Sequence, residues 1–170
     1  MKRKMLTFTL ILLVQFYEAT ATQDCSQNKT IEIRNQKVDS NLLLKVLREE
    51  ELCGKIRAII LTNASLRELP PDVFSGGRLR HLERVELDHN LLTQLPSHMF
   101  ADLPSLSSLS VSNNRLSAVS SLHLPAALAR IDFSVNKLAN SADNIFSASS
   151  TFQVNYAELR ANSFVNISRP

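Results

Sequence analysis

The sequence contains no tryptophan, only two tyrosines and only three glycines in 170 residues. Such a shortage of large aromatic rings argues against a ligand pocket formed as an aromatic cage. Two of the glycines are adjacent, Gly76 and Gly77, and none belongs to a glycine-rich loop of the kind that cradles phosphate. The scarcity of these residues therefore argues against two common kinds of small-molecule site.

Catalytic and metal-binding patterns are also missing from the sequence. The histidines are dispersed and no serine or cysteine nucleophile is placed in a tight elbow beside one of them. No set of histidines, cysteines and carboxylates has the spacing of a metal site. We therefore expect no enzyme, no cofactor and no metal, and we expect the histidines to be solvated surface residues; they are His81, His89, His98 and His123.

The first 21 residues have the layout of a secretory signal peptide. A basic start at 2–4 precedes an apolar run at 6–14, and Ala19-Thr20-Ala21 supplies the small residues of a cleavage site. The alternative is a membrane anchor, but the apolar run is shorter than the roughly 20 residues that span a bilayer. We expect the segment 1–21 to be removed and the product to be secreted and extracellular.

Removal of this segment changes the charge of the chain. The whole sequence has a formal net charge of +3, and the segment 1–21 holds three basic residues and one acidic residue, so the remainder has a net charge of +1. A charge so close to zero creates no long-range field that attracts nucleic acid. We therefore expect no nucleic-acid partner. No other run is apolar enough to span a membrane.

Leucines recur in the pattern L-x-x-L-x-L-x-x-N-x-L-x-x-L-P-x-x-x-F. Consecutive asparagine positions lie 26, 24, 22 and 26 residues apart, and a period in this range is typical of a solenoid. The fourth and sixth positions of the pattern lie two residues apart, so both point to one face of a short strand. The asparagine positions are Ala64, Asn90, Asn114, Asn136 and Asn162.

Parallel stacking of these strands, about 4.8 Å apart, would bury the leucines against one another. The asparagine would satisfy backbone groups where the chain turns after each strand. The pattern places Leu87 inside and Glu86 in solvent, so Glu86→Ala should hardly change stability. It also predicts a column of stacked aromatic rings at Phe74, Phe100 and Phe146.

The pattern with its L-P-x-x-x-F ending resembles the extracellular "typical" leucine-rich-repeat proteins. This group includes Toll-like receptor ectodomains, secreted insect leucine-rich immune proteins, neuronal adhesion receptors and small matrix proteoglycans. The resemblance implies an α/β-type leucine-rich-repeat solenoid with short parallel strands on its concave face and an irregular or 3-10 convex side. It covers residues 54–170, in about five repeats of which the last is incomplete.

An N-terminal cap is expected over residues 22–53, because an open solenoid end exposes core and strand edges. The segment 30–33 alternates like a strand, and a short helix is expected over 42–47 after an N-cap at Asp39 or Ser40. Cys25 and Cys53 are expected to form a disulfide in an oxidising compartment, and two free thiols are the alternative. The family's cap usually carries four cysteines, so this resemblance is partial.

The C-terminal end shows no cysteine cap after the incomplete fifth repeat. Two explanations are open. The chain is a fragment or truncated product of a longer receptor-like protein, or a partner such as a second leucine-rich-repeat chain covers this end.

The variable strand positions are expected to point to the concave face and to bind partners. They form a streak of acidic residues flanked by arginines, which suits a protein or glycoconjugate of mixed charge; the alternative is that these positions are simply solvated. In repeat one, Ala58, Ile60 and Thr62 are expected to lie against the cap. The candidate ligand-binding residues are Arg84, Glu86, Asp88, Ser110, Arg130, Asp132, Tyr156 and Glu158.

Three N-x-S/T sequons predict glycans at Asn28, Asn63 and Asn166. A glycan on Asn63, near the concave rim, would bar ligands from repeat one. These features together predict a secreted recognition module of the innate-immune or receptor-ectodomain type. The alternatives are an adhesion or guidance protein, or a fragment of one, and a secreted enzyme inhibitor.

Overall fold

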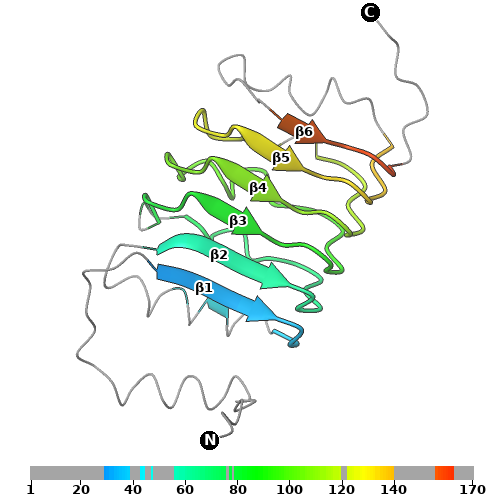
Figure 1. The fold of residues 1–170 in the computed structure, drawn as a ribbon, viewed down its shortest axis with the longest axis horizontal. Coiled ribbons are helices and arrows are strands. Elements are labelled where there is room, and N and C mark those ends of the chain that lie inside the picture. Colours follow the sequence, from blue (N-terminus) through cyan, green and yellow to red (C-terminus); the bar gives the residue numbers. More distant parts are fainter. Residues whose placement is uncertain are drawn as a thin grey trace, which may run out of the picture.

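Six parallel strands form a single sheet in which spatial order follows chain order (Figure 1). The computed structural model describes residues 29–38, 43, 44, 47, 56–75, 77, 79–119, 122–139 and 156–162. Because each strand pairs only with its neighbours in the sequence, every turn of the chain adds one coil to a stack. The strands are β1 (Lys29–Arg34), β2 (Ile56–Thr62), β3 (Arg84–Glu86), β4 (Ser108–Ser110), β5 (Arg130–Asp132) and β6 (Tyr156–Glu158).

The central residue of each of the middle strands β3, β4 and β5 points into the core, and its two neighbours point outward. In β3, β4 and β5 that central residue is at most 1% exposed, and the register aligns Val85, Leu109 and Ile131. Two residues further on, Leu87 bonds through its N–H to the carbonyl of Ser110, so the same register continues beyond the strands. The predicted alignment of inward residues in neighbouring coils is confirmed.

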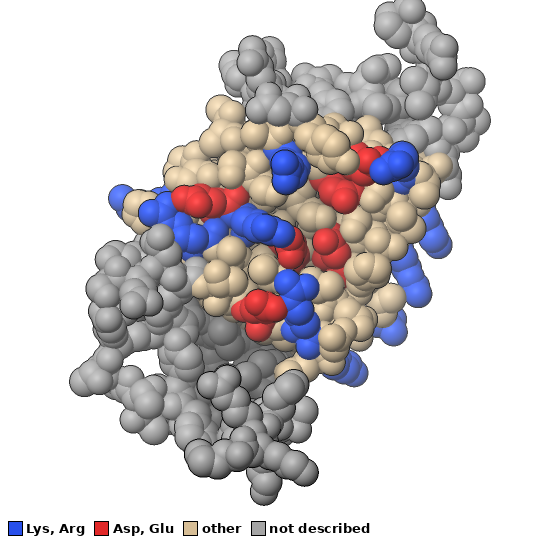
Figure 2. All heavy atoms as spheres, viewed as in Figure 1, with Lys and Arg blue, Asp and Glu red and all other residues tan. Residues whose placement is uncertain are grey.

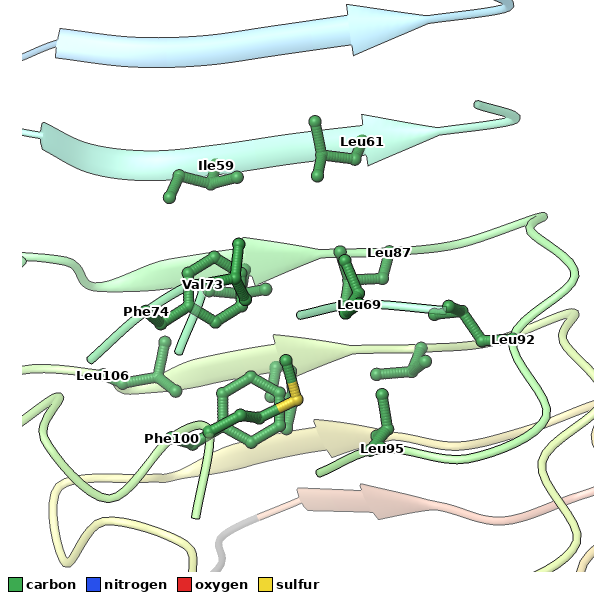
Figure 3. Close-up of a cluster of buried hydrophobic side chains, with 14 of the residues drawn as sticks. Ile59, Leu61, Leu69, Val73, Phe74, Leu87, Leu92, Leu95, Phe100 and Leu106 are labelled. Atoms are coloured by element: carbon green, nitrogen blue, oxygen red, sulfur yellow. The ribbon is translucent and has the colours of Figure 1, made fainter. Parts of the chain in front are cut away.

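The core lies between the sheet and irregular segments on the convex side. Leucines and phenylalanines from these segments close over the inward strand residues (Figure 3). Phe74 and Phe100 stack with ring centroids 5.9 Å apart and an angle of 22° between their planes, as predicted. Phe146 lies outside the described residues. In the described part the convex segments are turns and bends, which confirms the irregular form expected there.

The asparagine that follows each strand bonds to the preceding coil. In Asn114, Oδ1 accepts from the N–H of Leu92 at 3.1 Å, and Nδ2 donates to the carbonyl of Leu87 at 2.9 Å. Asn90, Asn136 and Asn162 repeat this arrangement. The expected role of the asparagine is therefore confirmed, and we call these four residues the asparagine ladder.

Each coil turns at a left-handed residue placed directly before the ladder position. These residues have φ values of 53–56°. Asparagine adopts this conformation readily, whereas a β-branched residue does not. Val135 occupies the position in the fourth coil and is also 45% exposed, so it gains little from burial. The five residues are Asn63, His89, Asn113, Val135 and Ala161.

The N-terminal end of the stack begins with β1, in agreement with the predicted strand over 30–33. It pairs in parallel with β2, and Ile60 of β2 is buried, so this position is not part of a solvated surface. Leu43, Leu44 and Leu47 are helical, and Leu43 and Leu47 are buried. The segment 1–21, Asp39 and Ser40, and both cysteines of the predicted disulfide, Cys25 and Cys53, lie outside the described residues.

Burial decreases at β6. Ala157 is exposed and Leu159 is half-buried, whereas their partners in the preceding coil, Ile131 and Phe133, are fully buried. The core is therefore tightest in the middle coils. Within the part of the chain that the structure describes, no helix has both the length and the apolar character needed to cross a bilayer.

Candidate binding face

The outward strand residues form three columns across the sheet face seen in Figure 2. Strand register places equivalent residues side by side, and β1 adds Thr30, Glu32 and Arg34 to the three columns in turn. The first column is Ala58, Arg84, Ser108, Arg130 and Tyr156, and the second is Ile60, Glu86, Ser110, Asp132 and Glu158. Backbone bonds extend the register to the third column, Thr62, Asp88, Ser112, Ser134 and Arg160.

Several of the charges on this face neutralise one another within a strand. Residues two apart project from the same face, so an arginine can reach the carboxylate beside it. Arg84 donates from Nε to Glu86 at 2.8 Å, and Arg160 donates from Nε to Glu158 at 2.7 Å. Arg34 and Glu32 form a third pair of this kind. Glu86 and Glu158 of the predicted acidic streak are therefore each paired with an arginine.

Glu86 is less open than the sequence suggested. Only 14% of its side chain is exposed, and it accepts from Arg84, so the expectation that it simply faces solvent is wrong. The side chain of Arg84 and the neighbouring residues of this face partly enclose it. Truncating Glu86 would remove a partner from Arg84 as well as a charge, so it is not a neutral control for a core substitution.

The two aspartates of this face bond to the backbone and hydroxyls of the strand ends. Asp88 Oδ1 accepts from Ser110 Oγ at 2.6 Å and from the N–H of Ser112 at 2.8 Å. Asp132 Oδ1 accepts from the N–H and the hydroxyl of Ser134, at 2.8 and 2.6 Å. Asp88 thus joins two coils, and Asp132 fixes the end of its own strand. Both are more engaged in the scaffold than their place on the surface suggested.

Arg130 and Tyr156 form a cationic and aromatic pair at the start of β5 and β6. The guanidinium carbon of Arg130 lies 5.9 Å from the ring centroid of Tyr156, within the range of a cation–π interaction. Tyr156 is 50% exposed and donates from its hydroxyl to Glu158 at 3.0 Å. That hydrogen bond raises the pKa of Tyr156, and the hydrogen bond from Arg160 lowers the pKa of Glu158. The ring is therefore held in place while one face stays open.

Two histidines from neighbouring coils meet, which sequence reasoning did not find. The rings of His98 and His123 stack with centroids 4.0 Å apart, and the N–H of His123 donates to the carbonyl of Ser97 at 2.8 Å. Both are exposed, as predicted. They follow their ladder asparagines by eight and nine residues, and this offset hid their alignment. No group of three or more histidines, cysteines or carboxylates that could hold a metal occurs among the described residues.

Asn63 lies in the turn directly after β2, at the edge of the concave face. It is exposed, and its Nδ2 donates to Asn35 Oδ1 at 2.9 Å. Its side chain is thus accessible at the place where the sequence predicts a glycan. The other two sequon residues, Asn28 and Asn166, lie outside the described part of the chain.

Comparisons with known proteins agree with this architecture. The leucine rich repeat family profile matches residues 55–116. Human Toll-like receptor 5 is 36% identical over 103 residues, which are 58% of this chain and 12% of that protein. Mouse Tsukushi is 37% identical over 81 residues, which are 45% of this chain and 22% of Tsukushi. The matched region therefore spans less than a quarter of the length of either relative.

A solved structure gives the same result for the fold. The crystal structure of the APL1 leucine-rich repeat domain matches with a TM-score of 0.60, at 19% identity, over 82% of this chain and 41% of that one. At this identity the match supports the solenoid architecture and no specific role. The repeat pattern, the parallel stack and the relatives agree: this chain is a leucine-rich-repeat protein, related through its repeats to Toll-like receptor 5 and Tsukushi.

Proposed function

We propose that this chain is a secreted recognition module that binds an extracellular protein or glycoconjugate through its concave face, in the manner of a receptor ectodomain or innate-immune leucine-rich-repeat protein. The observation that carries the proposal is the exposed Arg130–Tyr156 pair on a rigid sheet. Arginine and tyrosine are enriched among the residues that contribute most to protein interfaces. Both side chains are partly ordered before binding, which lowers the entropy lost when a partner docks.

The charges of the face support a partner of mixed charge. The ion pairs place an arginine of an outer column beside a carboxylate of the middle column, so the acidic middle column is flanked by positive groups (Figure 2). Such a pattern favours a partner with complementary alternating charges, and it offers little to a uniformly anionic nucleic acid. The aspartates are already hydrogen-bonded to the strands. We therefore assign the main contacts with the partner to Arg130 and Tyr156, and secondary contacts to the exposed atoms of the ion pairs.

The proposal includes processing in the secretory pathway. We infer that the segment 1–21 is removed, that residues 22–53 form a cap closed by a Cys25–Cys53 disulfide, and that the sequons carry glycans. The mass of the secreted species tests this inference. It should correspond to residues 22–170 plus glycan and should fall after glycan removal, and alkylation without reduction should label no thiol. Retention of 1–21, or two alkylated thiols in the native protein, would contradict it.

A binding experiment tests the concave face directly. The secreted full chain is used to capture partners from extracellular fluid and from a library of displayed ectodomains, in parallel with Arg130→Ala/Tyr156→Ala. A partner of this face should lose at least about tenfold in affinity, because residues at the centre of an interface typically contribute about 2 kcal/mol or more.

Arg80→Ala serves as the matched control for this experiment. Arg80 is exposed in a convex loop, where its Nε donates to the Gly77 carbonyl at 3.4 Å. It should keep full binding, and circular dichroism should show that all variants fold alike. The proposal fails if every captured partner binds the double variant as tightly as the native chain.

A further inference from the structure

Four basic side chains project from the edge of the sheet at which the strands end. We call this set the basic flank, and it consists of Lys37, Arg67, Arg115 and Lys137, all of them exposed. Figure 2 shows basic side chains following one another along this edge. The concave binding face does not use these residues.

The coils remain in register beyond the strands, and this places the flank residues along one edge of the stack. Backbone N–H groups of Leu91, Arg115 and Lys137 donate to carbonyls of the preceding coil at 2.7–2.9 Å. Neighbouring coils in such a parallel arrangement lie about 4.8 Å apart. The alternate residues Leu66, Leu92, Leu116 and Leu138 are buried, so the residues between them point outward. Arg115 and Lys137 therefore project from equivalent positions of neighbouring coils, and Lys37 and Arg67 project from the same edge of the first two coils.

The basic flank is not neutralised as the concave arginines are. On the concave face, Arg84 and Arg160 bond to carboxylates, whereas the basic flank forms no such ion pair in the described structure. Glu68 is the single acidic residue at the exposed flank positions of the described coils, and it stands beside Arg67. Repulsion between like charges in the flank falls when an anionic ligand binds. The net charge of the edge thus favours a polyanion.

We propose that the basic flank binds a linear sulfated polysaccharide. Guanidinium and ammonium groups spaced along one edge match sulfates distributed along a chain, and charge-assisted hydrogen bonds to sulfate are among the stronger polar contacts. Several exposed residues between the cations carry hydroxyl or amide groups that can bond to sugar hydroxyls. These interleaved residues are Ser65, Thr93, Gln94 and Ser117.

Two other polyanions fit this edge less well. Single-stranded nucleic acid binds through aromatic side chains on which bases stack, and the described flank positions expose no aromatic ring. An anionic membrane is a flat surface that is bound most firmly when apolar side chains accompany the basic ones. The exposed residues between the cations here are mostly small or polar, and the apolar ones are the partly exposed Leu91 and the exposed Val135. The cations also follow one edge of the stack, which favours an extended chain.

The test uses the secreted full chain and immobilised heparin as the probe. Arg115→Ser/Lys137→Ser removes two neighbouring cations and introduces the residue found at the matching position of the second coil, Ser65. The logarithm of the affinity should fall with the logarithm of the salt concentration, and the double variant should lower this slope by about one for each lost contact. Arg115 and Lys137 are chosen because a glycan on Asn63 would lie near Lys37 and Arg67, where it would interfere with heparin binding.

Arg80→Ser is the matched single-charge control against Arg115→Ser, and it should bind heparin like the native chain. Equal retention of the native chain and the double variant, or an equal loss with Arg80→Ser, would overturn the proposal. Retention by single-stranded DNA or phosphatidylserine vesicles but not by heparin would also overturn it and would assign the edge to that ligand. Capture of concave-face partners should be unchanged in Arg115→Ser/Lys137→Ser, so the two proposals can fail separately.

Discussion

The asparagine ladder predicts that two identical substitutions have unequal costs. Asn90 donates to the carbonyl of Leu61 at 2.7 Å and accepts from the N–H groups of Ala64 and Leu66 at 3.0 and 3.1 Å. Ala64 occupies the ladder position of the preceding coil and has no side-chain amide that could bond to the backbone there. These three backbone groups therefore have no second partner among the described residues, and Asn90→Ala leaves all three unpaired.

Asn114 shares most of its partners with other groups. Its Oδ1 accepts from the N–H of Leu92, which loses its only described partner in Asn114→Ala. Each carbonyl to which Asn114 donates keeps another donor. The carbonyl of Leu87 keeps the side-chain amide of Asn90, that of Val111 keeps the side-chain amide of Asn136, and that of Ser112 keeps the N–H of His89. Asn114→Ala thus leaves one backbone group unpaired.

A buried polar group without a partner costs about 1–3 kcal/mol. We therefore expect Asn114→Ala to lower the free energy of unfolding by about 1–3 kcal/mol, and Asn90→Ala to lower it by at least about 3 kcal/mol. Urea unfolding followed by far-ultraviolet circular dichroism measures both, with the exposed Thr93→Ala as control. An equal or smaller loss for Asn90→Ala would refute the reasoning, because it would show that the number of unpaired backbone groups does not set the cost.

Three further outcomes are expected. Leu87→Ala, at a fully buried position, should cost about 2–5 kcal/mol in the same unfolding assay, and a loss like that of Thr93→Ala would contradict its place in the core. Val135→Asn should raise the free energy of unfolding by about 1 kcal/mol, because asparagine tolerates a φ of 53° and valine does not; an unchanged melting temperature would count against strain there. Asn63→Gln should reduce the mass of the secreted protein by one glycan, and an unchanged mass would mean that Asn63 is unmodified.

The fold was largely predictable because the buried core requires apolar residues and asparagines at regular intervals in the sequence. Inward residues such as Leu87 must be apolar in every coil, and the ladder asparagines must recur because each coil has the same turn to satisfy. The first strand was also found from its alternating residues. The coils differ in length, from 22 to 26 residues, but the strands keep the same register because the extra residues fall in the convex segments.

The candidate site was predictable only as a list of positions. The sequence placed Glu86, Asp88 and Asp132 on the concave face, but it did not show that each is already hydrogen-bonded. Such partners depend on side-chain conformations across neighbouring strands, which periodicity does not record. The stacked histidines, His98 and His123, escaped for a related reason, because coils of different length offset them by one residue.

The two exposed surfaces differ in how their charges are balanced, and this difference assigns them different partners. Ion pairs on the concave face fix both signs in a rigid array, so affinity there must come from shape, from matched charges and from the Arg130–Tyr156 pair. The basic flank has unbalanced positive charge and small neighbours, so affinity there must come from counterion release and fall steeply with salt. A partner that carries sulfated sugar next to a folded protein surface could bind the concave face and the basic flank at once. Because the two sites would then be linked, binding at one would raise the effective concentration at the other, and the total affinity would rise without any additional contact. Salt should then weaken the flank contact selectively, leaving a residual affinity that Arg130→Ala/Tyr156→Ala removes.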